Sequence, residues 1–352
     1  MSNSTVSGAF GDAIVAPRQV SRVGVPTPTD QAARLRHMVS AMSAGGVSGP
    51  GSKPADIATK ASEYAQESPP VIALTSGKGG VGKTSLSVNL AIAMRQLGLR
   101  ITLIDGDLGL ANADVMCGLT PGLRLDAVMS GRAIDSIAVD APGGFRLVPG
   151  TVGISRLADL GPAEKQRLLK GFTSIGRQSD AVLLDTGAGI NSAVLALLAA
   201  ADSIVVVMTP EPTSMTDAYA LIKCLEQNRL QAQAGMSASL RRPLQISVLV
   251  NQTRDYAEAQ RVHTRLAGVC GRFLALRPAF IGAVGFEPEV TQSIRRRQPL
   301  LLSHPRLKWS KQVGTIAQAI ADAQIPKAHS MASRNVNPGK GLRSFFESLL
   351  SR

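Results

Sequence analysis

The chain has 352 residues, 44% of them apolar, which is enough to bury a sizeable core in one α/β domain with tails. No apolar run approaches the roughly 20 residues of a membrane span, and the N-terminus lacks the basic-then-apolar pattern of an export signal. The three cysteines have no metal-binding spacing, so we expect reduced thiols in a cytoplasmic protein.

The formal net charge of +13 is unevenly distributed along the chain. Residues 71–240 hold 14 Lys/Arg and 14 Asp/Glu, whereas residues 241–325 hold 13 and 5. The excess in the last third favours partners that carry phosphate, either anionic lipid or nucleic acid. A solvated basic surface without a partner is the alternative.

We expect residues 1–67 to form a flexible tail that contains one short helix at about 29–43. Thr29 is a candidate N-cap, and apolar residues follow at helical spacing. A helix this short between two flexible stretches is only marginally stable alone. The pattern therefore predicts docking, either on its own domain or in a groove of a partner.

A glycine-rich loop lies between a β-prone segment, 71–75, and an apolar pattern of helical period that begins at residue 86. In this context the loop is a P-loop, whose backbone N–H groups surround the phosphates of a nucleoside triphosphate. Lys83 then reaches the β and γ phosphates, and the Thr84 hydroxyl ligates Mg²⁺. A chance glycine-lysine turn is the weaker alternative. The predicted nucleotide-binding residues are Gly77, Lys78, Gly79, Gly80, Val81, Gly82, Lys83, Thr84 and Ser85.

Lys78 lies one position after the first glycine of this loop, where most P-loops have no lysine. The pattern K-G-G-x-G-K-[ST] at 78–84 resembles the deviant Walker A motif of the MinD/ParA family of dimerising ATPases. The resemblance implies slow ATP hydrolysis by a homodimer that forms with ATP. It also implies that Lys78 crosses the dimer interface and neutralises charge that develops on the partner's nucleotide during phosphoryl transfer.

A buried strand predicted at 100–104 ends in two carboxylates, Asp105 and Asp107. Carboxylates at the C-terminal end of such a strand lie in the crevice where ligands bind. Asp105 is placed to orient a magnesium-bound water, and the resemblance assigns Asp107 to the attacking water. The catalytic candidates are thus Lys78, Lys83 and Asp107, and a plain acidic turn is the alternative for the two aspartates.

A second buried strand begins at residue 181 and ends in Asp185, followed by glycines. This arrangement fits a Walker B aspartate that holds the Mg²⁺ shell, followed by a switch that senses the γ phosphate. Repeated buried strands of this kind predict a doubly wound α/β fold with a mostly parallel sheet and helices on both faces.

Another strand, predicted at 203–209, leads into a loop and a helix through residue 225. In the MinD/ParA family this loop and helix lie at the dimer face, so Glu211 and Asp217 are candidates there. Helix capping by Thr213 and Ser214 accounts for part of the same composition.

A late strand predicted at 245–250 ends in Asn251, which is the candidate for a hydrogen bond to the adenine base; a structural turn asparagine is the competing interpretation. The last strand is predicted at 278–284. A helix that starts at Glu287-Pro288 and carries residues 295–297 follows it, and then a final helix over 305–323. The ATPase domain is therefore expected to span 68–325.

Residues 326–340 have the composition of a tether, and 341–352 form a predicted amphipathic helix. A terminal helix with two adjacent phenylalanines is suited to a membrane interface, and MinD-type proteins carry such a tail. Two copies in a dimer would bind an anionic membrane far better than one. Docking on its own domain is the alternative. The apolar face consists of Leu342, Phe345, Phe346, Leu349 and Leu350.

A narrower resemblance lies in the N-terminal tail. The pattern D-Q-A-x-x-L-R, carried by Asp30, Gln31, Ala32, Leu35 and Arg36, is similar to the activation motif of the FlhG branch of the MinD/ParA family. That branch regulates flagellar number and placement from the inner face of the cell membrane. The resemblance implies that this segment binds the signal-recognition-type GTPase FlhF. Flagellar switch proteins or a transcriptional activator are further implied partners.

Two related functions compete with a flagellar role. A partition ATPase of the ParA type would bind DNA nonspecifically through the basic last third, which explains the charge but neither tail. A division-site regulator of the strict MinD type would lack the N-terminal helix. We therefore do not expect DNA to be the main partner.

Overall fold

The computed structural model of the chain describes residues 69–107, 110–151, 175, 178–233 and 244–325. Its strands form one sheet in the order β3-β4-β2-β5-β1-β6-β7-β8, and the described strand pairs are parallel except β3 with β4. The predicted doubly wound, mostly parallel sheet is confirmed. The strands are β1 Val71–Ser76, β2 Ile101–Gly106, β3 Val139–Asp140, β4 Arg146–Val148, β5 Ala181–Ala188, β6 Ser203–Met208, β7 Ile246–Thr253 and β8 Ala279–Gly285.

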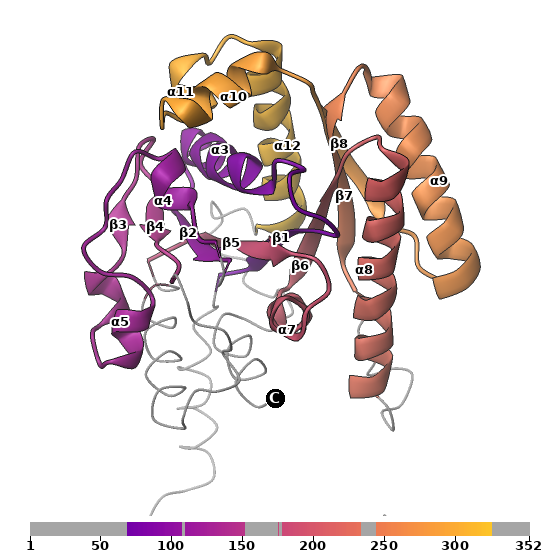
Figure 1. The fold of residues 1–352 in the computed structure, drawn as a ribbon, viewed down its shortest axis with the longest axis horizontal. Coiled ribbons are helices and arrows are strands. Elements are labelled where there is room, and N and C mark those ends of the chain that lie inside the picture. The colour runs from indigo at the N-terminus through magenta and orange to yellow at the C-terminus, as the bar shows by residue number, and fades with distance from the viewer. Residues whose placement is uncertain (1–68, 108–109, 152–174, 176–177, 234–243, 326–352) are drawn as a thin grey trace, which may run out of the picture. The chain divides into compact units, whose positions relative to one another are not determined.

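Helices cover both faces of the sheet (Figure 1). On one face α3 packs on β2, β5 and α12, while on the other face α7, α8 and α9 pack on β5, β6 and β7 respectively. None of the helices that the structure describes is long and apolar enough to cross a membrane. The helices are α3 Lys83–Gln96, α4 Ala113–Met116, α5 Asp126–Met129, the 3-10 turn η1 Ile134–Ser136, α7 Ser192–Ala200, α8 Pro212–Ala232, α9 Tyr256–Leu274, α10 Pro288–Arg295, α11 Leu300–Ser303 and α12 Lys308–Gln324.

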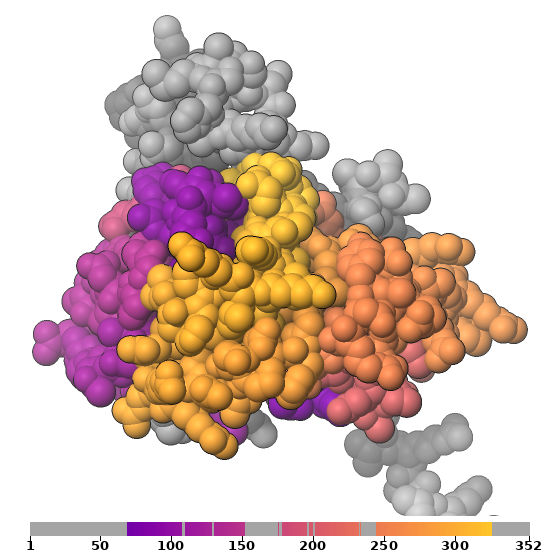
Figure 2. Space-filling view, turned by 90° about the horizontal axis from the view of Figure 1, so that it is seen from above, coloured from indigo at the N-terminus to yellow at the C-terminus, as the bar shows by residue number. Residues whose placement is uncertain are grey.

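The central strands are apolar on both sides because both faces of the sheet are covered. In β1, Val71 and Ala73 belong to the core under α7–α9, whereas Ile72 and Leu74 belong to the core under α3 and α12. Every residue of β1, β2 and β6 is buried. The polar groups of the site therefore gather at the ends of these strands. Seen from above, α9–α12 form the orange and yellow surface beside the indigo surface of α3 (Figure 2).

Two helix boundaries differ from the sequence-based expectation. Helix α10 ends at Arg295, so Arg296 and Arg297 are not helical: Arg297 has φ 55°, and the N–H of Gln298 donates to the Ser293 carbonyl at 3.0 Å. This left-handed turn closes the helix end, and Pro299 follows it. The last helix, α12, begins at Lys308 rather than at residue 305.

The start of α8 also differs. Pro212 is its first residue and Glu211 is the N-cap, without a side-chain capping bond. The capping interpretation of Thr213 and Ser214 is therefore wrong. The Ser214 hydroxyl instead accepts the Thr209 N–H at 3.0 Å.

Asn89 joins α3 to α11 inside the core. Its side chain is 2% exposed, donates to the Ser85 carbonyl at 2.7 Å and accepts the Leu301 N–H at 2.8 Å. Both partners are backbone groups in the core, where water cannot replace the hydrogen bond that the Asn89 side chain makes with each of them. The asparagine therefore fixes α11, and the start of α12 behind it, against the helix that follows the glycine-rich loop.

We expect Asn89→Ala to lower the free energy of unfolding by roughly 1–3 kcal/mol, because the Leu301 N–H is left buried without its acceptor. Urea denaturation followed by circular dichroism measures this change. Gln318→Ala on the exposed face of α12 is the matched control and should alter stability by less than about 0.5 kcal/mol. Equal midpoints for the two variants would contradict a bridging role for Asn89.

Candidate nucleotide-binding site

The glycine-rich loop connects β1 to α3 at the C-terminal edge of the sheet. Gly80 and Gly82 have φ of 81° and 85°, and Gly82 is the N-cap of α3 in a left-handed conformation. A Cβ built on Gly79 or Gly80 would meet nothing within 4 Å, so this part of the loop is open to a ligand. The first turn of α3 holds no acidic residue, which leaves its backbone N–H groups available to an anion.

Gly77 is required for a different reason. A Cβ at this position would lie 2.3 Å from the Asp217 carbonyl carbon and 2.7 Å from the Ala218 nitrogen. The backbone of the loop therefore lies directly against the first turns of α8. Asp217 is thus placed beside the P-loop through its backbone, while its side chain is half-buried.

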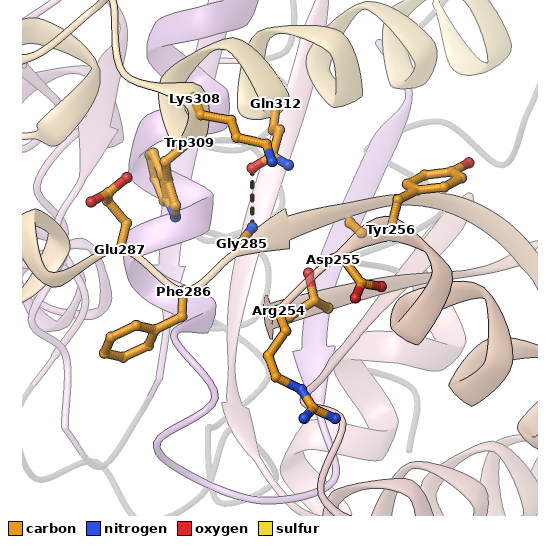
Figure 3. Close-up of a pocket in the computed structure, with 11 residues that line it drawn as sticks. Arg254, Asp255, Tyr256, Gly285, Phe286, Glu287, Lys308, Trp309 and Gln312 are labelled. Carbon is orange, nitrogen blue, oxygen red and sulfur yellow. Dashed lines mark hydrogen bonds between the residues drawn. The ribbon is translucent and has the colours of Figure 1, made fainter.

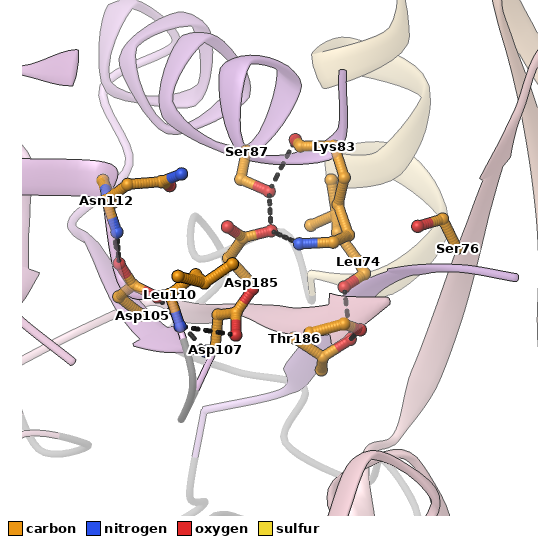
Figure 4. Close-up of polar contacts among 12 residues, drawn as sticks. Leu74, Ser76, Lys83, Ser87, Asp105, Asp107, Leu110, Asn112, Asp185 and Thr186 are labelled. Atoms are coloured by element: carbon orange, nitrogen blue, oxygen red, sulfur yellow. Dashed lines mark hydrogen bonds and ion pairs between the residues drawn. The ribbon is translucent and has the colours of Figure 1, made fainter. Parts of the chain in front are cut away.

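Lys83 is buried and forms an ion pair with the Walker B aspartate. Its Nζ lies 2.9 Å from Asp185 Oδ1, and the Ser87 hydroxyl donates to the same oxygen at 2.9 Å (Figure 4). Lys83 is 8% exposed and Asp185 is fully buried. The other oxygen of this carboxylate, Oδ2, is buried and has no hydrogen-bond partner among the described residues.

Asp105 lies directly opposite Asp185, because β2 and β5 are paired in that register. Its Oδ2 accepts the N–H groups of Asn112 and Ala113 at 2.9 and 3.0 Å, and its Oδ1 accepts the Asp107 N–H at 3.2 Å. Burial, and then the charge of Asp185, raise the pKa of Asp105 to about 7. Asp105 therefore holds the start of α4 against the end of β2, a role the sequence did not indicate.

Asp107 lies at the open end of the same strand. Its Oδ1 accepts the Leu110 N–H at 3.2 Å, and a Cβ built on Gly187 would lie 3.4 Å from that oxygen. The loops after β2 and β5 therefore meet at this carboxylate. Each loop also presents an apolar side chain to solvent, Leu110 at 76% and Ile190 at 49% exposure.

Lys78 points to α8 rather than back to its own loop. Its Nζ forms an ion pair with Glu211 and donates to the Thr213 hydroxyl at 3.1 Å. The side chains of Lys78 and Glu211 are 32% and 60% exposed, so the pair lies at the surface. The structure thus brings together two residues, Lys78 and Glu211, that the sequence placed at the dimer face for separate reasons.

Asn251 braces the P-loop from the end of β7. Its Nδ2 donates to the Val81 carbonyl at 2.8 Å, and its Oδ1 accepts the Gln252 N–H at 2.9 Å. A Cβ on Gly82 would lie 2.6 Å from Nδ2, so a glycine is required there. Asn251 therefore has the structural role that was the competing interpretation, and its contact with adenine stays a prediction.

A pocket of about 150 Å³ opens at the ends of β7 and β8 (Figure 3). The sequence analysis missed it, because its walls come from three segments far apart in the chain. The Gly285 N–H donates to Gln312 Oε1 at 3.0 Å and so ties β8 to α12 across the pocket. Its lining is Thr253, Arg254, Asp255, Tyr256, Ala283, Gly285, Phe286, Glu287, Lys308, Trp309 and Gln312.

Comparisons with known proteins agree with this geometry. A family model described as an AAA domain matches residues 70–237. A chain of the MinC:MinD cell division protein complex of Aquifex aeolicus superposes with a TM-score of 0.56 and 26% identity, and the match covers 73% of this chain and 98% of that chain. The antiactivator FleN of Pseudomonas aeruginosa is 36% identical over 281 residues, 80% of this chain and 93% of FleN. The chain belongs to the MinD/ParA family of P-loop ATPases.

The flagellum site-determining protein YlxH of Helicobacter pylori is also similar, with 30% identity over 79% of this chain and 89% of YlxH. Together with FleN it places this MinD/ParA-family member closest to the flagellar branch, as the tail motif predicted. The predicted tail residues, from Asp30 to Arg36 and from Leu342 to Leu350, lie outside the residues that the structure describes.

The residues of this MinD/ParA-family site fit a Mg²⁺ ion beside a nucleotide. Asp185 Oδ2 is a buried carboxylate oxygen without a partner in the described part of the chain, and Asp105 opposite it has a raised pKa. A divalent cation would give Asp185 Oδ2 a partner. It would also offset the negative charge that helps to raise the pKa of Asp105. Thr84, the second residue of α3, supplies the hydroxyl that completes the expected ligands.

We expect the nucleotide-free protein in EDTA to lose stability as the pH rises from about 4 to about 7, because of Asp105. Its carboxyl keeps its proton in the folded state up to a pH near 7, whereas in the unfolded chain it ionises near 4, so the folded state binds more protons across this window. Asp105→Asn lacks this contribution. Between roughly pH 5 and 8, the free energy of unfolding should decrease in both proteins. The decrease should be about 2 kcal/mol smaller in Asp105→Asn than in the unchanged chain.

Urea denaturation at the two pH values measures the difference, and Asp322→Asn on the exposed end of α12 is the matched control. Equal pH dependence in the unchanged chain and Asp105→Asn would show that Asp105 is ionised when folded.

Proposed function

We propose that this chain is an ATP-dependent, dimerising switch ATPase that regulates flagellar number and placement. The observation that carries the proposal is the P-loop with an additional surface lysine, Lys78, held beside Glu211 at the edge where Asp107 and the two switch loops also lie. Similarity to FleN and YlxH supports the flagellar assignment.

ATP binds with its phosphates in the loop 77–85, where Lys83 exchanges its contact with Asp185 for the β and γ phosphates. Mg²⁺ is held by Thr84 and Asp185, with Asp105 behind its water shell, and supplies charge neutralisation at the phosphates. The base lies toward Asn251 and the neighbouring pocket at the ends of β7 and β8. Support for this placement comes from the open glycines and from the position of the pocket along the same edge of the sheet.

Two chains close face to face, and Lys78 of each leaves Glu211 to reach the nucleotide of the other. Glu211 and Asp217 then lie at the interface, where the exposed side chains of Leu110 and Ile190 add apolar surface. Asp107 positions the attacking water, and the slow hydrolysis that follows returns the chain to the monomer. The position of Asp107 beside Gly187, near the end of β5, supports a switch in which the segments after β2 and β5 move together.

The tails connect this cycle to partners. The helix at about 29–43, with Asp30, Gln31, Leu35 and Arg36, binds the FlhF-type GTPase, and the C-terminal helix binds the anionic inner face of the membrane in the dimer. The role of FleN as an antiactivator supports a transcriptional activator as a further partner of this chain. A ParA-type ATPase that binds DNA is the second candidate, favoured by the basic excess of residues 241–325.

We expect Asp107→Ala to accumulate as a dimer in ATP, because the water is no longer positioned and hydrolysis stops after closure. Lys83→Ala should bind no ATP and stay monomeric, and Lys78→Ala should bind ATP without forming a dimer. Size-exclusion chromatography with light scattering, in ATP and in ADP, measures all three. Lys311→Ala, on the exposed face of α12, is the matched control. A monomeric Asp107→Ala protein with bound ATP would contradict the switch role of this residue.

We expect the full chain to sediment with phosphatidylglycerol-containing vesicles in ATP but not in ADP, and a truncation after Ala328 to lose this binding. The apolar face from Leu342 to Leu350 supplies the membrane contact, and two copies act together in the dimer. Duplex DNA should not be retarded in either nucleotide. DNA binding that needs ATP and survives the truncation would instead support the partition ATPase, while the Asp107→Ala result would still report on dimerisation.

A further inference from the structure

The outward face of α9 carries a stripe of arginines that none of the functions above uses. Arg261, Arg265 and Arg272 are exposed and fall on one side of the helix at offsets of four and eleven residues. None of them forms an ion pair with a described residue. From first to last they extend over about 16 Å of helix.

The opposite side of α9 fixes the orientation of this stripe. Ala259, Leu266 and Cys270 are buried in the core, and α9 packs on β7, β8 and α8 (Figure 1). The Asp255 side chain caps the helix by accepting the Glu258 N–H at 2.7 Å. The arginines are therefore held on a rigid support rather than on a loop, which lowers the entropy cost of a contact with them.

The sequence around the stripe is strongly basic, and Glu258, one helical turn before Arg261, is the acidic residue whose charge Arg261 shares with Arg254. Residues 259–286 contain four arginines and no aspartate or glutamate. Glu258, which precedes them, is already engaged by Arg254 through a hydrogen-bonded ion pair. The fourth arginine, Arg277, lies across the end of the helix, since a Cβ on Gly271 would meet its Nε at 3.0 Å. All four cations are arginines, which match carboxylates in a bidentate manner that lysine does not.

Apolar side chains and a gap adjoin the arginine stripe. Val269 and Phe273 are 39% and 64% exposed, and the Arg272 guanidinium lies 5.3 Å from the centre of the Phe273 ring. Gly268 lies within the stripe, and a Cβ built there would meet nothing within 4 Å. A glycine inside a helix lowers stability relative to alanine, and here it leaves no side chain between the arginines.

We infer that this face of α9 is a docking surface for an acidic amphipathic helix of a protein partner. Carboxylates of the partner pair with Arg261, Arg265 and Arg272, and its apolar residues cover Val269 and Phe273. Arginine and aromatic side chains together are typical of the energetically dominant centre of protein interfaces. Phosphate binding by DNA would have no use for the exposed phenylalanine, and two apolar side chains are too few to insert into a membrane.

A display library of random peptides of about 15 residues, panned on the full chain in ATP and in ADP, tests this inference. We expect the enriched peptides to combine Asp or Glu with apolar residues at helical spacing, as one face of a helix requires. A synthetic copy of an enriched peptide should bind the chain in fluorescence anisotropy. Its affinity should fall about tenfold or more with Arg265→Glu and with Phe273→Ala.

Two further variants separate charge and shape from folding. Gly268→Leu keeps every charge but fills the gap, so it should weaken the peptide by a similar factor while the thermal midpoint stays the same or rises. Arg306→Glu reverses an exposed arginine between α11 and α12 and should leave peptide affinity unchanged. Loss of binding in Arg306→Glu as well would mean that only net charge matters, and the docking surface would be rejected.

Duplex DNA and phosphatidylglycerol vesicles form the parallel arms. Duplex binding that is lost in Arg265→Glu but kept in Phe273→Ala would identify a phosphate surface and overturn the inference. Vesicle binding lost in both variants would identify a membrane contact and would also overturn it. Three outcomes of the peptide arm would also overturn the inference. The first is that the enriched peptides lack acidic residues, and the second is that panning on the unchanged chain enriches no more peptides than panning on Arg265→Glu. The third is that the peptide binds the unchanged chain and both variants with equal affinity.

Discussion

The site depends on two buried carboxylates that lie opposite each other, with Lys83 of the P-loop as the lysine paired with one of them. Asp105 and Asp185 face each other because β2 and β5 pair in that register, and Lys83 contacts only Asp185. When both carboxyls are ionised, the cluster carries one more negative than positive charge in a place shielded from water. A proton on Asp105 removes that excess, and so does a divalent cation at the free oxygen of Asp185. A divalent cation bound there would therefore stabilise the folded chain at neutral pH.

The lysine that defines the family has a partner within its own chain. Lys78 pairs with Glu211 at the surface, where an ion pair contributes only a fraction of a kcal/mol up to about 1 kcal/mol. Breaking this pair would therefore cost little if Lys78 moves to a nucleotide phosphate in trans, as proposed above. In the single chain, the same contact holds the Lys78 ammonium at α8. A weak surface pair is suited to the reversible step that the proposed cycle requires.

Sequence patterns anticipated most of this architecture, because buried parallel strands are continuous apolar runs and the P-loop spacing is strict. The predicted strand ends lie within three residues of the observed ends at Gly106, Ala188 and Thr253. What the sequence could not show depends on contacts between distant segments. The bonds from Asp105 to the start of α4, the pairing of Lys78 with Glu211 and the pocket at the ends of β7 and β8 each need a register or a packing distance. Helix ends were the least predictable, since the left-handed turn at Arg297 has no glycine to mark it.

One helix connects the nucleotide site to the far side of the molecule. Helix α8 carries Glu211 at its N-cap, its Asp217 backbone lies against Gly77 of the P-loop, and farther along it packs on α9. Because Gly77 has no space for even a Cβ, a shift of the loop on nucleotide binding is passed to α8 by direct contact rather than absorbed. Any displacement of α8 then bears on the helix that presents the arginine stripe. Coupling of this kind requires α8 to have two discrete positions, and the proposed exchange of Lys78 between Glu211 and a partner's nucleotide would supply the reason for two.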